Sequence, residues 1–262
     1  CCQRRINTDT MKRIFITGVS SGIGKELALE YAKQKCVIGI SARRHELLKN
    51  IAKNCNNLGS KTHVYQLDVQ DRKKCEEVIG EFLKVAGGID CVIANAGIGG
   101  DDNLFSGTSK NINNILNTNI KGVTNVIMPF IPIMKSQNHG TLVSVSSVAS
   151  YMPLPFHGGY ASSKIAIRRI FDSWRPSLQK YNLNLVSISP GFIDTPMVKG
   201  PARNFPLQKA NYAAKKFIYA IEKGKNNFIY PKYYYFIIWL FNLTPMWFYN
   251  WFIKKMFSKP FN

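Results

Sequence analysis

The stretch RIFITGVSSGIGKELALEYA, residues 13–32, contains a change from one kind of local structure to another. Its first five residues are rich in β-branched and aromatic side chains, which favours a strand over residues 13–17. Ile23, Leu27 and Tyr31 then recur at helical spacing, so a helix is predicted over residues 23–34. The stretch therefore predicts a strand, a glycine-rich turn and a helix in immediate succession.

The turn between these elements carries glycines whose spacing suits the binding of a phosphate group. Gly18 permits a tight bend, Gly22 permits the close approach of a pyrophosphate, and Gly24 permits close packing of the helix on the strand. The start of the helix also offers free N–H groups and a partial positive charge. Plain strand–turn–helix connections contain the same glycines, so both interpretations stay open at this point. The residues predicted to contact a dinucleotide here are Gly18, Ser20, Ser21, Gly22, Ile23 and Gly24.

Strand-like and helix-like segments alternate along most of the chain. Further strands are predicted over residues 37–41, 63–67, 89–94, 141–145, 183–189 and 228–230, and further helices over residues 46–54, 72–85, 111–134, 160–181 and 208–222. This alternation predicts an α/β fold, a doubly wound parallel sheet of about seven strands with helices on both faces, in three layers. We expect a disordered leader at residues 1–11, one folded domain at residues 12–227 and an aromatic C-terminal extension at residues 228–262.

The composition limits the partners and the redox environment. The chain has 262 residues, 45% of them hydrophobic, and a formal net charge of +20. This charge favours phosphates, nucleic acid or anionic lipid as partners, but no motif for nucleic-acid binding is visible. No cysteine pair has metal-ligand or redox-motif spacing, so we expect no metal, reduced thiols and a cytoplasmic location. The cysteines are Cys1, Cys2, Cys36, Cys55, Cys75 and Cys91.

The second predicted strand ends in a pair of arginines. A cofactor with a free ribose 2′-hydroxyl prefers an acidic side chain at this place. Arg43 and Arg44 instead suit a 2′-phosphate, because a guanidinium donates paired hydrogen bonds to phosphate oxygens. This pattern predicts NADP(H) rather than NAD(H); the alternative is that the arginines only solvate the start of a helix. Further cofactor contacts are predicted after the third and fourth strands, at Asp68, Val69, Asn95, Ala96 and Gly97.

A tyrosine and a lysine four residues apart point to proton transfer. Tyr160 and Lys164 share one face of a predicted helix, and Ser147 follows the fifth strand at its carboxyl end. A free phenol is a poor base at neutral pH, and a nearby cation such as Lys164 favours its ionised form. Tyr160 would then exchange the hydroxyl proton while hydride moves, and Ser147 would hydrogen-bond the substrate oxygen. The alternative is an exposed helix face without a chemical role.

In order and spacing, these motifs resemble those of the short-chain dehydrogenase/reductase family from Lys12 to about Phe228. The resemblance implies a Rossmann-like seven-stranded sheet. It also implies that the tyrosine is the general acid/base, that the lysine also binds the nicotinamide ribose, and that an asparagine holds a water in a proton relay. The implied tetrad is Asn119, Ser147, Tyr160 and Lys164. The further matching residues are Thr17, Gly18, Gly22, Ile23, Gly24, Asp68, Asn95, Ala96, Gly97, Pro190 and Gly191.

Several residues around this tetrad have alternative interpretations. The family spacing selects Ser147 over its neighbour Ser146, whereas physical reasoning does not separate them. His157 either perturbs the proton affinity of Tyr160 or lies in an exposed loop. The segment at residues 192–206 is expected to form a mobile lid over the substrate. The segment after the sixth strand is expected to run past the amide group of the nicotinamide, with contacts from Pro190, Gly191, Ile193 and Thr195.

The C-terminal extension carries no charge from Tyr233 to Ile253 and contains many aromatic residues. Three interpretations compete. The first is an interfacial membrane anchor of two short helices divided at Pro245, with flanking lysines on anionic lipid. The second is a protein interface or a cover for the substrate pocket, and the third is one transmembrane helix.

The sequence therefore predicts an NADP(H)-dependent carbonyl reductase or alcohol dehydrogenase that acts on a small apolar substrate. The alternative is a non-catalytic dinucleotide-binding scaffold or sensor, docked to a membrane or a partner protein. The expected assembly is a homo-oligomer, and the expected location is cytoplasmic with possible peripheral attachment to a membrane.

Overall fold

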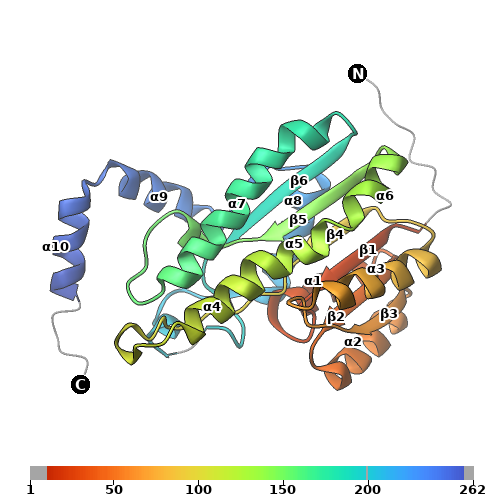
Figure 1. Cartoon of the computed structure of the whole chain (residues 1–262), viewed down its shortest axis with the longest axis horizontal. Helices are drawn as coiled ribbons and strands as arrows, with labels where there is room; N and C mark the ends of the chain where they lie inside the picture. Colours follow the sequence, from red (N-terminus) through yellow and green to blue (C-terminus); the bar gives the residue numbers. More distant parts are fainter. Residues whose placement is uncertain (1–10, 199, 257–262) are drawn as a thin grey trace.

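The computed structural model describes residues 11–198 and 200–256 (Figure 1). The predicted leader lies outside the described residues apart from Met11. Seven strands form one parallel sheet of order β3-β2-β1-β4-β5-β6-β9, which confirms the predicted fold class. The strands are β1 Arg13–Thr17, β2 Val37–Ala42, β3 Lys61–Gln66, β4 Cys91–Ala94, β5 Gly140–Val145, β6 Leu183–Pro190 and β9 Asn227–Tyr230.

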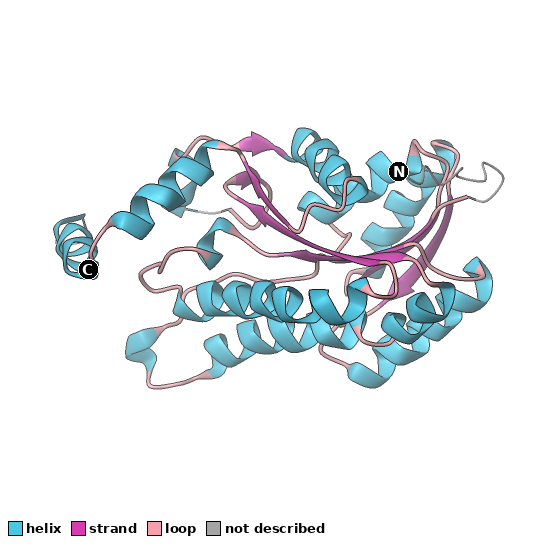
Figure 2. Cartoon of the chain, turned by 90° about the horizontal axis from the view of Figure 1, so that it is seen from above, coloured by secondary structure: helices cyan, strands magenta, loops and turns pink. Residues whose placement is uncertain are grey.

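Helices cover both faces of this sheet, as Figure 2 shows with the strands seen between two layers of helices. The central strands are buried along almost their whole length, as expected for parallel strands covered on both sides. One apolar core packs the sheet against α1, α2 and α8, and the other packs it against α3, α5, α6 and α7. The helices are α1 Gly22–Ala32, α2 His45–Asn57, α3 Arg72–Ala86, α4 Lys110–Leu116, α5 Gly122–Ile127, α6 Phe130–Gln137, α7 Gly158–Gln179, α8 Ala210–Glu222, α9 Tyr233–Leu243 and α10 Met246–Met256.

The single helix predicted over residues 111–134 is wrong. The segment comprises α4, a π-helical stretch over Asn117–Lys121, α5 and α6. Pro129 stands between α5 and α6, where its missing N–H removes one hydrogen bond from the helical pattern. Single π-helical turns recur at functional sites, and this one contains Asn119 of the predicted tetrad.

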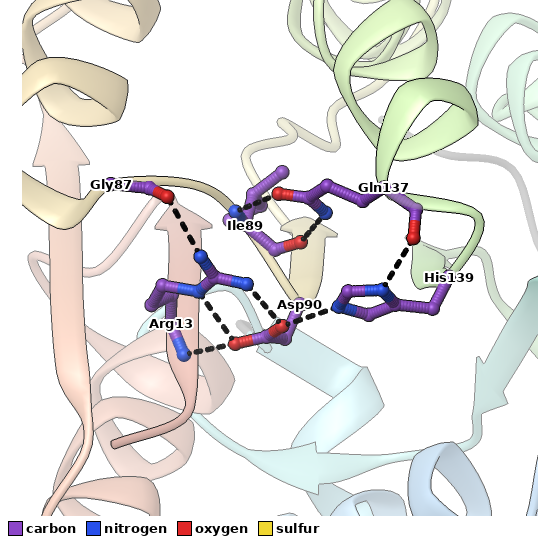
Figure 3. A network of polar contacts seen from close by, with 6 residues as sticks. All are labelled: Arg13, Gly87, Ile89, Asp90, Gln137 and His139. Atoms are coloured by element: carbon purple, nitrogen blue, oxygen red, sulfur yellow. Dashed lines mark hydrogen bonds and ion pairs between the residues drawn. The ribbon is translucent and has the colours of Figure 1, made fainter. Parts of the chain in front are cut away.

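The amino-terminal edge of the sheet is fixed by a network of charged groups (Figure 3). Arg13 donates to both carboxylate oxygens of Asp90 and to the carbonyl of Gly87. His139 lies 3.0 Å from Asp90 through Nε2, so the network joins β1 to the segments around β4 and β5. Burial alone would raise the pKa of Asp90, but the hydrogen bonds from Arg13 and His139 outweigh it and leave this pKa below its ordinary value. The network lies opposite the edge that carries the predicted site and serves stability.

The cysteines inside the fold are buried thiols. Cys36, Cys55, Cys75 and Cys91 are all free and buried in the described part of the chain. Burial raises the pKa of Cys36 to about 11 and that of Cys91 to about 12, so the reactive thiolate is suppressed. The prediction of reduced, apolar-like cysteines is confirmed for these four; Cys1 and Cys2 lie outside the described residues.

The start of the C-terminal extension differs from the predicted division. The seventh strand, β9, pairs with β6 from Asn227 to Tyr230, so a boundary between residues 227 and 228 crosses a strand of the sheet. After β9 the chain forms α9 and α10, which Figure 1 shows at one end of the molecule, beyond the sheet. Neither these two helices nor any other helix in the described residues is long and apolar enough to cross a membrane.

Candidate active site

The predicted site residues meet at the carboxyl edge of the sheet. Thr17 ends β1, Ala94 ends β4, Val145 ends β5 and Pro190 ends β6, and all four strands run in the same direction. The strand order reverses between β1 and β4, because the chain first builds outward to β3 and then returns to β4. Open α/β sheets bind their ligands at such a reversal point.

The glycine-rich turn after β1 is locked to the turn after β4. Thr17 Oγ1 accepts the N–H groups of Asn95 and Ala96, and Asn95 Nδ2 donates to the carbonyls of Thr17 and Gly18. Gly18 has a φ of 71°, and a Cβ there would lie 2.7 Å from Ala96 Cα. Only glycine fits this backbone conformation and this close approach. The amide of Asn95 thus holds the shape of the turn, a role that the sequence did not reveal.

The start of α1 suits a phosphate group. Ser21 precedes the helix in an extended conformation, and its side chain accepts no hydrogen bond from the first turn. The N–H groups of that turn therefore have no side-chain cap. Arg44 donates to Ser20 Oγ at 2.7 Å and to Ser21 Oγ at 3.1 Å, which brings a guanidinium to the turn. Arg43 lies 3.9 Å from Asp68, and both side chains are largely exposed. The donor set fits an anionic dinucleotide.

Two further predicted cofactor residues have protein partners. Asp68 Oδ1 accepts the N–H of Gln70, which shapes the turn after β3. Val69 is buried, and a Cβ at Gly122 of α5 would lie 2.5 Å from its side chain. The side chain of Val69 therefore packs against α5.

The segment after β6 lies over the glycine-rich turn. A Cβ built at Gly22 would lie 3.1 Å from Thr195, so these two predicted cofactor residues are neighbours. Ile193 is buried in β7 Ile193–Asp194, which pairs with β8 Gln208–Lys209. The expected lid at residues 192–206 therefore contributes one strand, β7, to a small two-stranded sheet whose other strand lies just beyond it. The rings of Phe192 and Phe205 stack within the lid, with their centroids 4.7 Å apart.

Gly191 faces the C-terminal extension. A Cβ built at Gly191 would overlap the ring of Tyr234 in α9, so the glycine is required by packing as well as by any cofactor. Tyr234 and Ile238 form a small buried cluster with Ile229, and Val148 and Phe192 pack against it. The extension thus covers the segment that follows Pro190.

Ser147 stands at the end of β5, where its side chain acts on the pKa of Tyr160. Ser147 Oγ also accepts the N–H of Ala149 at 3.1 Å. Ser146 is different, because its hydroxyl donates to the backbone carbonyl of Lys164 at 2.9 Å. Ser146 is therefore engaged by the backbone, whereas Ser147 is the serine that acts on Tyr160, which is the choice that the family spacing makes.

Lys164 and Asn119 complete the group of four. Lys164 is 6% exposed, and its Nζ donates to the carbonyl of Val145 at 2.9 Å. Asn119 is fully buried; its Oδ1 accepts the N–H of Ile98, and its Nδ2 donates to Ile98 O and to Ser163 Oγ. Both N–H groups of the Asn119 amide therefore have protein acceptors, which ties the loop after β4 to α7.

Gly97 allows these groups to approach one another. A Cβ there would lie 3.1 Å from Asn119 Oδ1 and 3.2 Å from Lys164 Nζ. Any larger residue would force the amide or the ammonium to move. The predicted Asn-Ala-Gly turn after β4 and the predicted tetrad are thus one packed unit.

The two titratable groups have shifted pKa values. Burial raises the pKa of Tyr160, and the hydrogen bond with Ser147 acts in the opposite direction. Burial lowers the pKa of Lys164 to about 8. Lys164 Nζ lies 5.7 Å from the centre of the Tyr160 ring and points to Val145. Lys164 is not among the causes of the pKa shift of Tyr160, so the expected lowering of this pKa by Lys164 is absent from this structure.

Asp102 is a residue of the site that the sequence did not reveal. Its two carboxylate oxygens accept the N–H of Gly159 at 3.0 and 3.2 Å, in the first turn of α7 and one residue before Tyr160. Its own N–H donates to Phe156 O at 2.8 Å. Asp102 therefore fixes the start of the helix that carries Tyr160. His157, also considered near Tyr160, is exposed and makes no side-chain cap to α7.

Comparisons with known proteins agree with this geometry. The family model for short chain dehydrogenases matches residues 12–204. The 3-oxoacyl-(acyl-carrier-protein) reductase of Thermotoga maritima is 34% identical over 188 residues, which cover 72% of this chain and 76% of that protein. The 17-beta-hydroxysteroid dehydrogenase 13 of Mus musculus is 28% identical over 234 residues, which cover 88% and 77%.

Solved structures share the same fold. A short-chain type dehydrogenase/reductase from Mycobacterium marinum superposes with a TM-score of 0.80 at 22% identity, covering 86% of this chain and 96% of that one. An alcohol dehydrogenase from Thermococcus sibiricus, complexed with 5-hydroxy-NADP, superposes with a TM-score of 0.75 at 24% identity, covering 84% and 95%. The family match, the reductase relative and the parallel sheet all lead to the same assignment. The chain belongs to the short-chain dehydrogenase/reductase family and is an NAD(P)-dependent oxidoreductase.

Proposed function

We propose that this protein transfers hydride between NADP(H) and an apolar carbonyl or alcohol, with Tyr160 as the general acid/base. The observation that supports this most directly is the convergence of Asn119, Ser147, Tyr160 and Lys164 at the carboxyl edge of the sheet. A non-catalytic scaffold would need none of these four groups to converge there.

Each side chain has a distinct part in the proposed chemistry. The nicotinamide, when bound, supplies or accepts the hydride. Tyr160 gives its proton to the carbonyl oxygen in reduction and recovers it in oxidation, and Ser147 hydrogen-bonds the same oxygen as its charge develops. Lys164, still largely protonated at neutral pH with a pKa of about 8, places a positive charge on this side of the site. Asn119 holds the loop after β4 in place.

The proposed preference for NADP(H) rests on Arg43 and Arg44. Arg44 is fixed at the glycine-rich turn by Ser20 and Ser21, and Arg43 stands at the end of β2, beside Asp68. Two guanidinium groups at this edge stabilise a 2′-phosphate and gain nothing from a free 2′-hydroxyl. Asp68, Val69 and Thr195 remain further proposed contacts.

The proposed location is peripheral, at an anionic membrane surface, with a homo-oligomer as the proposed assembly. The exposed aromatic surface of the extension supports this location, and the net charge of +20 also favours binding to an anionic membrane. The competing proposal is a protein interface formed by that surface.

The test of the catalytic proposal is NADPH oxidation with a panel of aldehydes and ketones. Tyr160→Phe keeps the ring and removes the hydroxyl, so kcat is expected to fall at least about 100-fold, the lower end of the contribution of general acid catalysis. NADPH affinity, measured by fluorescence titration, should change little. Unchanged turnover in this variant would exclude Tyr160 as the proton donor, and tight NADPH binding without turnover of any carbonyl would favour the scaffold.

A further inference from the structure

The extension presents a surface of large apolar side chains that no part of the described chain covers. Tyr234 and Ile238 lie one turn apart and form the buried side of α9. Most of the other side chains of α9, and several of α10, are exposed. We call these side chains the aromatic face; its members are Tyr233, Tyr235, Phe236, Ile237, Trp239, Leu240, Leu243, Met246, Trp247, Phe248 and Trp251.

This face differs from the ordinary exposed side of a surface helix. Such a helix buries one apolar stripe and presents polar or charged residues to water. In α9, aromatic and aliphatic residues occupy both sides, and Trp247 in α10 is 71% exposed. Tryptophan and tyrosine favour the headgroup layer of a membrane, where the ring is shielded and the polar group remains hydrated.

The charged residues of the C-terminal segment that carries the aromatic face are all positive. Residues 223–262 contain six lysines and no aspartate or glutamate. Lys232 precedes α9 and Lys255 lies near the end of α10, and both are exposed. Anionic headgroups complement this pattern. In a symmetric contact between two copies, the same lysines would lie near each other, so a second copy suits the face less well.

The extension is also part of the wall around the candidate active site. Tyr234 packs on Gly191, and Val148, which follows Ser147 in the chain, packs against the cluster of Tyr234 and Ile238. Tyr249 of α10 donates from its hydroxyl to the carbonyl of Pro153 at 2.8 Å. A membrane or partner that binds the aromatic face would therefore lie next to the loop that begins at Ser147.

We infer that the aromatic face docks on an anionic lipid surface and that the site takes its substrate, a long-chain apolar carbonyl or alcohol, from that bilayer. This inference rests on the proposed hydride transfer and adds the physical state of the substrate and the partner surface. Docking places the substrate side of the site at the interface, so an apolar substrate reaches it without crossing water.

Tryptophan emission tests the docking directly. Three of the four tryptophans, Trp239, Trp247 and Trp251, belong to the aromatic face, whereas Trp174 is half-buried and stacks on Phe171 at the edge of the core. Adding vesicles of phosphatidylcholine with 30% phosphatidylglycerol to the full chain should shift the emission to the blue, and brominated lipid should quench it. Binding that appears only at low salt and without a blue shift would be charge attraction alone and would overturn the inference.

Matched variants separate insertion from a general loss of aromatic surface. The double variant Trp239→Ser/Trp247→Ser should co-sediment with these vesicles at least about tenfold more weakly, since two large apolar groups no longer leave water. Tyr219→Ser removes an exposed aromatic side chain from α8 and should bind as the wild type does. Equal binding by all three proteins would overturn the inference, as would concentration-dependent dimerisation through this face without lipid.

An activity measurement tests the origin of the substrate. With NADPH, the double variant should reduce a long-chain aldehyde embedded in vesicles at least about tenfold more slowly, while its rate with a short water-soluble aldehyde stays within about twofold of wild type. Equal rates on the embedded aldehyde would overturn the inference and leave the proposed reaction intact. If neither aldehyde is reduced, the proposed reaction fails, and the emission and sedimentation results still decide the docking.

Discussion

Lys164 is a buried cation whose removal should stabilise the free protein. It is 6% exposed, its Nζ donates to Val145 O, and it forms no ion pair with any acidic group in the described part of the chain. Burial lowers its pKa from 10.5 to about 8. At about 1.4 kcal/mol for each pH unit, this difference corresponds to a cost of about 3 kcal/mol in folding free energy at neutral pH.

The substitution Lys164→Met keeps an unbranched side chain and removes the charge. Loss of the hydrogen bond to Val145 O offsets about 1 kcal/mol, so the free energy of unfolding at pH 7 should rise by about 2 kcal/mol. The melting temperature should rise by about 4–8 °C for a chain of this size. Carbonyl reduction should fall strongly, because the proposed site loses its cation.

The dependence on pH gives this prediction its sign. The folded pKa lies below the unfolded one, so between about pH 8 and 10.5 the unfolded chain holds a proton that the folded chain has released. The cost is therefore complete below pH 8 and disappears as the pH rises through this range. Buried cysteines such as Cys36, whose pKa is raised to about 11, act in the opposite direction, so only the difference between variant and wild type is diagnostic.

Urea unfolding of wild type and Lys164→Met at pH 7, 8.5 and 10 provides the measurement. Lys73→Met removes an exposed lysine from α3 and should change the free energy of unfolding by less than about 0.5 kcal/mol at every pH. The reasoning is refuted if Lys164→Met is less stable than wild type at pH 7, or if its advantage is the same at pH 10.

Three further outcomes follow from individual contacts. Arg44→Ser should raise KM for NADPH at least about tenfold and leave KM for NADH nearly unchanged, measured by initial rates; a parallel rise for both cofactors would contradict the proposed 2′-phosphate contact. Asp90→Asn should lose about 2 kcal/mol in urea unfolding at pH 7, because the ion pair with Arg13 is broken. Since the pKa of Asp90 is lowered in the fold, its stabilisation exists above the ordinary carboxyl pKa near 4 and fades as the pH falls; a constant difference down to pH 2 would count against this. Gly191→Ala should destabilise the chain by about 1–3 kcal/mol because the added methyl meets Tyr234, and the effect should shrink in a Tyr234→Ala background; an unchanged effect would place the clash elsewhere.

The sequence predicted the fold well where the signal is local. Alternating strand and helix patterns gave six strands within about three residues of their ends, and β9 was expected at residues 228–230. The helix over residues 111–134 was wrong because apolar spacing alone does not register the π-helical stretch or the break at Pro129. Periodicity reports which side of a segment is buried, and short interruptions do not change that side.

Part of the site also followed from spacing alone. Tyr160 and Lys164 stand four residues apart, so one helix must bring them to the same face, and the glycines of the first turn have fixed positions along the chain. Asn119 entered only through the family resemblance. The structure gives the physical reason for its place, because its amide joins Ile98 to Ser163.

Other features depended on contacts between distant parts of the chain. Asp102 meets Gly159 across 57 positions, and Tyr249 meets Pro153 across 96, so no local pattern indicates either pair. The raised pKa of Tyr160 likewise results from burial, which depends on how distant segments pack around the phenol.

By itself, the sequence determined the doubly wound sheet, the glycine-rich turn, a serine after the fifth strand, and a tyrosine and a lysine on one face of the helix that follows. Only the tertiary structure decided that Ser146 is engaged by the backbone of α7 while Ser147 meets Tyr160, and that α9 packs on Gly191. The reason is physical: periodic burial is encoded over a few residues, whereas a hydroxyl's partner or a helix's docking place depends on which distant surfaces pack together.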